Sequence, residues 1–105
     1  MPCYMIVRAR IADREKFARY TAVVPALVQR FGGRYLVLGG ATTVLEGPWP
    51  ADAPEPKTVI SVWPDRAAAE AFWQSPEYRA ACELREGAGE FAIQLVDGLP
   101  GASPP

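Results

Sequence analysis

Hydrophobic and polar residues alternate near the start of the chain, which predicts a β-strand over residues 3–11. In a strand, successive side chains point to opposite faces of the sheet. Tyr4 and Ile6 would therefore lie on one face, and Met5 and Val7 on the other. Because both sets are largely apolar, neither face of this strand is designed for full contact with water.

A helical period follows this strand. Apolar residues recur at steps of three and four, which predicts one face of a helix about five turns long. Asp13 is suited to cap its start, and the pair Gly32-Gly33 is suited to end it. Pro25 lacks the N–H that would bond to the residue four positions back, so we expect it to bend or split the helix. The residues of the apolar face are Phe17, Tyr20, Thr21, Val24, Leu27, Val28 and Phe31.

The next apolar run contains a pair of glycines. Residues 34–38 and 42–46 both suit strands, and Gly39 and Gly40 separate them. A two-residue glycine turn would make a hairpin, whereas a glycine bulge would keep one long strand. We favour the bulge, because each arm of a hairpin would have only five residues and the following strand comes after a long loop.

The second half of the chain repeats the strand and helix signals. Residues 47–56 contain four prolines and predict an exposed loop. Strands are predicted at residues 57–63 and 90–96. Two short helices lie between them, with Asp65 and Ser75 placed to cap their starts.

This order of elements predicts an α+β fold, a ferredoxin-like split βαβ unit with four main antiparallel strands. We expect a single domain over residues 1–98 and a flexible C-terminal tail over residues 99–105. Helices of such a unit cover one face of the sheet only. The other face is also apolar, so we expect a second copy to cover it in a homodimer with sheet packed on sheet.

Composition removes several classes of function. The net charge of −1 leaves no basic surplus for phosphate backbones, so we expect no nucleic-acid partner. No apolar run approaches the ~20 residues that span a bilayer, and the N-terminus lacks the pattern of a signal peptide, so we expect a cytoplasmic protein without membrane contact. The absence of histidine excludes hydrolases with a histidine base and argues against a metal site. Cys3 and Cys82 are expected to be reduced.

One helix face near the C-terminus carries the strongest candidate for a site. Tyr78, Ala81, Cys82 and Arg85 fall at helical steps, so Arg85 would be drawn inward with Tyr78. An inward guanidinium needs a carboxylate, and Glu46, at the end of the predicted long strand, is the one at a matching depth. Three alternatives are open: a structural ion pair, a shared ligand or catalytic site, and no contact.

Tyrosine and tryptophan side chains add further candidates, because their rings are apolar and their polar tips require partners. Trp49 lies in the proline-rich loop, where it would be a pocket lid, a dimer contact or an exposed ring. The predicted ligand-binding residues are Tyr20, Tyr35, Glu46, Trp49, Trp63, Tyr78 and Arg85.

The chain also resembles a known family. The segments FGGRYLVLGG, VLEGPWP, FWQSPEYRAACELREGA and FAIQLVDG are similar to those of the domain-of-unknown-function 1330 (DUF1330) family, over residues 4–98. The resemblance implies a dimeric α/β barrel in which Tyr20, Glu46, Tyr78 and Arg85 are shared features. It implies no reaction. The wider group includes cofactor-free monooxygenases, haem-degrading enzymes, muconolactone-type isomerases and stress-induced proteins. Haem use there normally requires a histidine, so we expect no cofactor here.

Two functions follow as hypotheses. The first is a homodimer that binds a small molecule, for which an anion is one option, near Glu46, Tyr78 and Arg85. The alternative is a cofactor-free enzyme, monooxygenase-like or isomerase-like, in which Glu46 is the acid–base group and Arg85 binds an anionic or enolate oxygen. Tyr78 or Tyr20 would then donate a proton. An arginine partner would make the carboxylate a poor base, which favours the first hypothesis.

Overall fold

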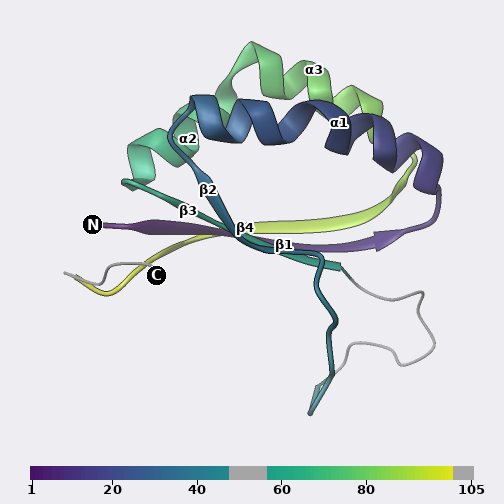
Figure 1. Cartoon of the computed structure of the whole chain (residues 1–105), viewed down its shortest axis with the longest axis horizontal. Helices are drawn as coiled ribbons and strands as arrows, with labels where there is room; N and C mark the ends of the chain where they lie inside the picture. Colours follow the sequence, from purple (N-terminus) through teal and green to yellow (C-terminus); the bar gives the residue numbers. More distant parts are fainter. Residues whose placement is uncertain (48–56, 101–105) are drawn as a thin grey trace.

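The computed structural model describes residues 1–47 and 57–100. Four strands form one sheet, and three helices lie on a single face of it (Figure 1). The elements are β1 (Cys3–Ile11), α1 (Arg14–Arg30), β2 (Arg34–Leu38), β3 (Lys57–Trp63), α2 (Arg66–Gln74), α3 (Pro76–Leu84) and β4 (Gly89–Asp97).

The strands follow the order β2-β3-β1-β4, and every neighbouring pair is antiparallel. β1 is central, so that Ala9 lies opposite both Lys57 of β3 and Phe91 of β4. The crossover from β1 to β2 and the crossover from β3 to β4 place their helices on the same face (Figure 1). The predicted α+β, ferredoxin-like fold is therefore confirmed.

The three helices begin at the capping residues that were predicted from the sequence. The Asp13 side chain accepts a hydrogen bond from the Lys16 backbone N–H at 3.1 Å, and Asp65 caps α2 in the same way. Ser75 accepts from the Tyr78 N–H at 3.1 Å at the start of α3. Each cap satisfies a backbone donor that has no partner inside the helix.

The effect predicted for Pro25 is partly wrong. α1 is not split: it runs from Arg14 to Arg30 with Pro25 inside it. Proline removes one backbone hydrogen bond, but the flanking turns keep theirs. Val24 and Val28, on either side of Pro25, are buried against the rest of the protein and hold the helix in place. Packing thus overrides the local preference.

The predicted long strand with a bulge at Gly39-Gly40 is also wrong. β2 ends at Leu38, and its register shift lies between Tyr35 and Val37. Gly39 has a φ of 71°, and its N–H donates to the Thr58 carbonyl at 2.9 Å. β2 lies at the edge of the sheet and β3 begins at Lys57, so residues 42–46 have no strand among the described residues to pair with. The hairpin alternative fails for the same reason.

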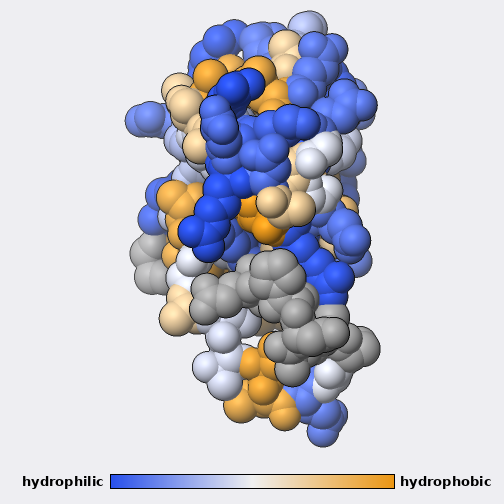
Figure 2. Space-filling view, turned by 90° about the vertical axis from the view of Figure 1, so that its right-hand side faces the viewer, coloured by the Kyte–Doolittle hydropathy of each residue, from blue (hydrophilic) through white to orange (hydrophobic). Residues whose placement is uncertain are grey.

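Residues 40–47 instead extend below the sheet, on the side away from the helices (Figure 1). All of them are exposed, and Val44 and Leu45 keep 47% and 93% of their surface in contact with solvent. Hydrophobic surface is visible at the lower end of the molecule in Figure 2. The predicted proline-rich loop follows this segment and lies mostly outside the described residues.

The core lies between the helices and the sheet. Trp63 and Phe72 are each 1% exposed, and their ring centroids lie 4.9 Å apart. The indole of Trp63 leaves no room above Gly33, where a Cβ would stand 2.8 Å from the ring. Both cysteines are free thiols, with Cys3 buried in this core and Cys82 half-buried.

The opposite face of the sheet, which we call the outer face, carries Tyr4 and Ile6 of β1 and Ile60 of β3 among its apolar residues. These three side chains are only half-buried. No helix of the described residues covers them (Figure 1). None of the helices in the described part of the chain is long and apolar enough to cross a lipid bilayer.

Candidate functional site

A cavity of about 210 Å³ lies between α1 and the sheet. Its roof is formed by one face of α1, including Val24 and Val28, and inward-facing residues of all four strands also line it. Val7 and Ile93 are among the floor residues. The helix-covered face of the sheet is therefore incompletely filled, and the hollow is lined mainly by apolar side chains.

Two tyrosines form a polar pair in the wall of this cavity. Tyr20 of α1 and Tyr78 of α3 both line it, and their hydroxyl oxygens lie 2.8 Å apart, within hydrogen-bond distance. Their rings meet edge to face, with centroids 6.2 Å apart. Tyr78 is 1% exposed, so water cannot readily replace either partner. The pair joins the two helices and presents hydroxyl groups to a space lined mainly by apolar side chains.

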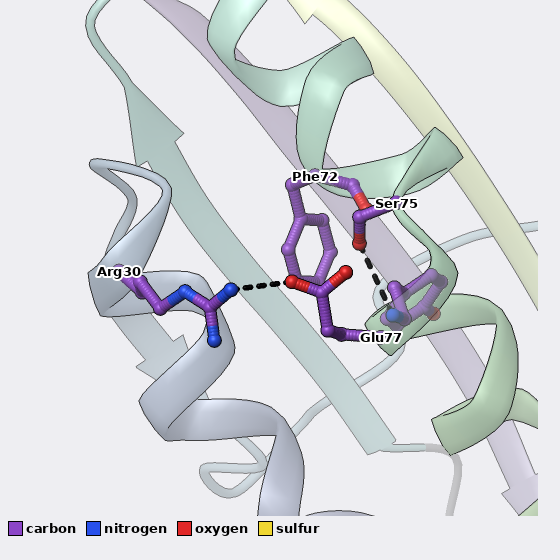
Figure 3. A network of polar contacts seen from close by, with 5 residues as sticks. Arg30, Phe72, Ser75 and Glu77 are labelled. Atoms are coloured by element: carbon purple, nitrogen blue, oxygen red, sulfur yellow. Dashed lines mark hydrogen bonds and ion pairs between the residues drawn. The ribbon is translucent and has the colours of Figure 1, made fainter.

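The turn between α2 and α3 holds Tyr78 in this position. The Ser75 hydroxyl donates to the Phe72 carbonyl at 2.8 Å and accepts from the Tyr78 N–H. Beside this turn, Arg30 of α1 forms an ion pair with Glu77 of α3 (Figure 3). These contacts tie the ends of α1 and α3 together and fix the tyrosine side chains relative to one another.

Burial keeps these hydroxyls protonated. It raises the pKa of Tyr78 and of Tyr20 above the ordinary value for tyrosine. Burial, and then the neighbouring Tyr20, raises the pKa of Tyr35 to about 12. At neutral pH the Tyr20–Tyr78 pair carries two hydroxyl protons, and their mutual hydrogen bond uses one. The second proton is available for an acceptor atom of a ligand.

Arg85 lies behind the tyrosines. It caps the C-terminus of α3, and its guanidinium carbon is 4.3 Å from the Phe91 ring centroid and 5.4 Å from that of Tyr20. Its Nη2 donates to the Cys82 sulfur at 3.8 Å, while its buried Nε has no hydrogen-bond partner among the described residues. Phe91 and Tyr20 line the cavity and Arg85 does not. Its charge therefore lies against aromatic faces, and no carboxylate among the described residues forms an ion pair with it.

Glu46 and Arg85 are not brought together by the chain. Glu46 is exposed on the segment that leads below the sheet, and the ion pairs between described residues do not include it. The pairing was predicted on the assumption that the strand continues to residue 46. Because β2 ends at Leu38, that geometry is lost. Of the three alternatives, the absence of contact is the one found within a single chain.

The other predicted residues divide between cavity and core. Tyr35 lines the cavity together with Tyr20 and Tyr78. Trp63 does not line it: the side chain is buried in the core, and its Nε1 donates to the Ser61 hydroxyl at 3.0 Å. Trp49 lies outside the described residues, so its proposed roles remain predictions.

Sequence reasoning missed Lys57 and Ser61, which both line the cavity. Alternation along β3 puts residues 57, 59 and 61 on one face, and that signal could have identified both residues. No carboxylate occurs among the described residues that line the cavity. Nor do the described residues contain a group of three or more histidine, cysteine or acidic side chains that could hold a metal ion.

The fold and this cavity define the class of protein: a ferredoxin-like α+β domain with a small hollow between its helices and its sheet. The chain belongs to the family described as domain of unknown function (DUF1330), whose pattern matches residues 2–99. No curated protein matches the chain.

Solved structures share the fold at low sequence identity. The RPA0582 protein of unknown function from Rhodopseudomonas palustris is 23% identical, with a TM-score of 0.72 over 93% of this chain and 82% of that one. SnoaB, a cofactor-independent oxygenase from Streptomyces nogalater, is 16% identical, with a TM-score of 0.66 over 93% of each chain. A dimeric ferredoxin-like protein of unknown function from Jannaschia sp. CCS1 is 13% identical, with a TM-score of 0.67 over 93% of this chain and all of that one.

Proposed function

We propose that this protein is a homodimer that binds a small organic molecule in the cavity beneath α1. The observation that carries the proposal is the hydroxyl pair of Tyr20 and Tyr78, at 2.8 Å in an apolar cavity of about 210 Å³. A fold that needed only a core would fill this space, because each void costs stability. An apolar hollow with a few convergent polar groups is the usual form of a ligand site.

The ligand should have an acceptor oxygen at the tyrosine end. The spare hydroxyl proton of the pair would donate to it, and the Arg85 guanidinium behind Tyr20 favours negative charge there. Tyr35 completes the tyrosine-lined wall. Glu46 takes part in this proposal only if it reaches a site in the assembled dimer.

The dimer is supported by the outer face of the sheet. Tyr4, Ile6 and Ile60 form an apolar strip there that no helix of the described residues covers. The segment with Val44 and Leu45 extends on the same side (Figure 1). A second copy packed on this face would bury both features. A neighbour of the same fold is described as dimeric, which supports self-association.

The proposal is tested by filling the cavity. Ala9 lies in its floor and is 2% exposed, so Ala9→Leu should reduce the space available to a ligand without adding charge. Binding of a panel of neutral phenols and phenol esters would be measured by calorimetry. We expect at least one binder, with affinity lowered about tenfold or more by Ala9→Leu.

Ala80→Leu is the matched control, because Ala80 is exposed on α3 and the same change in size there leaves the cavity untouched. It should leave affinity unchanged. Equal binding by wild type and Ala9→Leu would show that the ligand sits elsewhere, and absence of any binder in the panel would remove the support for a ligand site.

A cofactor-free oxygenase is the second candidate, and the likeness to SnoaB favours it. In this reading the tyrosine hydroxyls would hold the oxygen of a substrate enolate, and Arg85 would stabilise its charge. Oxygen uptake in the presence of a cavity-binding phenol distinguishes the two candidates. Uptake that requires wild-type protein and is lost in Tyr78→Phe would favour the enzyme, whereas binding without uptake would favour the ligand-binding role.

A further inference from the structure

Lys57 occupies a defined place at the edge of the cavity. It begins β3 opposite Ala9 of β1, and it lines the cavity together with Leu38 and Gly39 of the adjacent strand end. Gly39 would bring a Cβ within 3.8 Å of the Lys57 Cδ, so the aliphatic part of the lysine lies against this glycine. Lys57 is exposed, whereas Ala9 beside it is buried. It therefore stands where the cavity opens to solvent.

The charge of Lys57 is not used within the described structure. The ion pairs between described residues join other partners, and no described carboxylate lines the cavity. Lys57 is also the only cationic side chain among the described lining residues. An anionic group on a bound molecule would thus find a direct partner at this end of the cavity.

Tyr78 reaches the cavity from a deeper position than Lys57: it is 1% exposed, whereas Lys57 is exposed. Ser61 is four residues further along β3, which corresponds to about 13 Å. Phe72 lines the cavity with Ser61, and its ring centroid is 4.5 Å from that of Tyr78. The cavity therefore has a cationic group where it opens to solvent and a hydroxyl pair at a buried position, and most of its other lining side chains are apolar.

The volume limits the body of the ligand. A dry protein cavity of about 150 Å³ holds one benzene molecule. The present cavity, at about 210 Å³, has room for a single ring with small substituents. The enclosed part of the ligand should therefore be no larger than one ring, because protein interiors yield little to added volume.

We propose that the ligand of this cavity is an aromatic carboxylate with one ring: its carboxylate binds Lys57 at the mouth, and a hydroxyl or carbonyl oxygen at the opposite end binds the Tyr20–Tyr78 pair. This rests on the proposed ligand-binding function and adds the class of ligand and its direction. Lys57 selects for charge, the ring is held by apolar contacts, and the tyrosines select for the distal oxygen.

Three matched probes test the proposal: 4-hydroxycinnamate, its methyl ester and cinnamate. The ester lacks the negative charge and cinnamate lacks the distal hydroxyl. Affinities would be measured by calorimetry with wild type, Lys57→Met and Tyr78→Phe. Lys16→Met is the control, because Lys16 is exposed on α1 and does not line the cavity. Ala9→Leu reports whether binding is in the cavity at all.

We expect Lys57→Met to lower the affinity for 4-hydroxycinnamate about fivefold, a modest effect because an exposed charge contact is screened by water. The affinity for the ester should not change. High salt should weaken binding of the acid in every protein that retains Lys57, and should have little effect in Lys57→Met. Tyr78→Phe should lower the affinity for both hydroxylated probes and leave that for cinnamate unchanged. Lys16→Met should change nothing.

Two results would overturn the inference while leaving the cavity as a ligand site: acid and ester binding equally in wild type, or Lys57→Met and Lys16→Met weakening the acid equally. Binding of all three probes that is unaffected by Ala9→Leu would instead refute the cavity as their site, and with it the proposed function.

Discussion

The two faces of the sheet differ in how their apolar residues are covered. On the inner face, Met5 is 5% exposed and Ala9 2%, because the helices lie over them. On the outer face, Ile6 and Ile60 are half-buried, and no helix of the described residues covers them. Yet the covered face contains a cavity of about 210 Å³. A face of the sheet can thus be covered by helices without being completely filled by side chains. We propose that the inner face binds the ligand and that the outer face forms the dimer.

The largest effect is expected from a charge on the outer face. Ile60→Glu would bury carboxylates in the proposed dimer interface, at a cost of about 3–5 kcal/mol for an unpaired charge. In the monomer the same carboxylate reaches water, so the fold should survive. Light scattering should change from about twice the chain mass of 11.4 kDa to that of one chain.

Val23→Glu provides the comparison, because Val23 is 42% exposed on α1 and away from the outer face. It should remain dimeric. A wild-type protein that is a soluble monomer at micromolar concentration would refute the assignment of the outer face to assembly.

An intermediate effect is expected on the inner face, at the hydroxyl pair. Tyr78→Phe and Tyr20→Phe each leave one buried hydroxyl without its partner, which costs about 1–3 kcal/mol of unfolding free energy. The double variant leaves no hydroxyl without a partner. It should therefore lower the unfolding free energy by less than the sum of the two single variants. Urea unfolding at one fixed protein concentration gives all three values. Strictly additive costs would indicate that the two hydroxyls do not depend on each other.

The smallest effect is expected from Glu46 and Arg85, which lie apart. Glu46→Gln should change the unfolding free energy by less than about 0.5 kcal/mol, because the side chain is exposed. Arg85→Met exchanges contacts with the faces of Phe91 and Tyr20 for apolar packing, and we expect about 1 kcal/mol or less. The two changes should be additive within about 0.5 kcal/mol. Strong coupling in thermal melts would mean that the two residues meet in the dimer.

The elements themselves could be predicted because their signals are local. Asp13, Asp65 and Ser75 each bond to a backbone N–H three residues away, so a short window of sequence contains both partners. The alternation of β1 and the helical period of α1 are local in the same sense. The helical period of its face predicts Tyr78 as a site residue, whereas Tyr20 is predicted from the polar tip of its ring and from the resemblance to the DUF1330 family.

The predictions that fail are those that depend on a partner distant in sequence. Whether residues 42–46 form a strand depends on a neighbouring strand to accept their hydrogen bonds, and β3 begins too late to supply one. The charge of Arg85 required a partner, but the position of α3 offers aromatic rings and leaves Glu46 out of reach.

By itself, then, the sequence determined the helices, the strands, their caps and the two apolar faces of the sheet, because each depends on bonds or periods within a few residues. Tertiary structure decided where β2 stops, which side chains surround Arg85, and that α1 stands over a hollow lined by Tyr20, Tyr78 and Lys57. These features depend on distances between elements far apart in the chain. Packing sets such distances, and no local pattern encodes them.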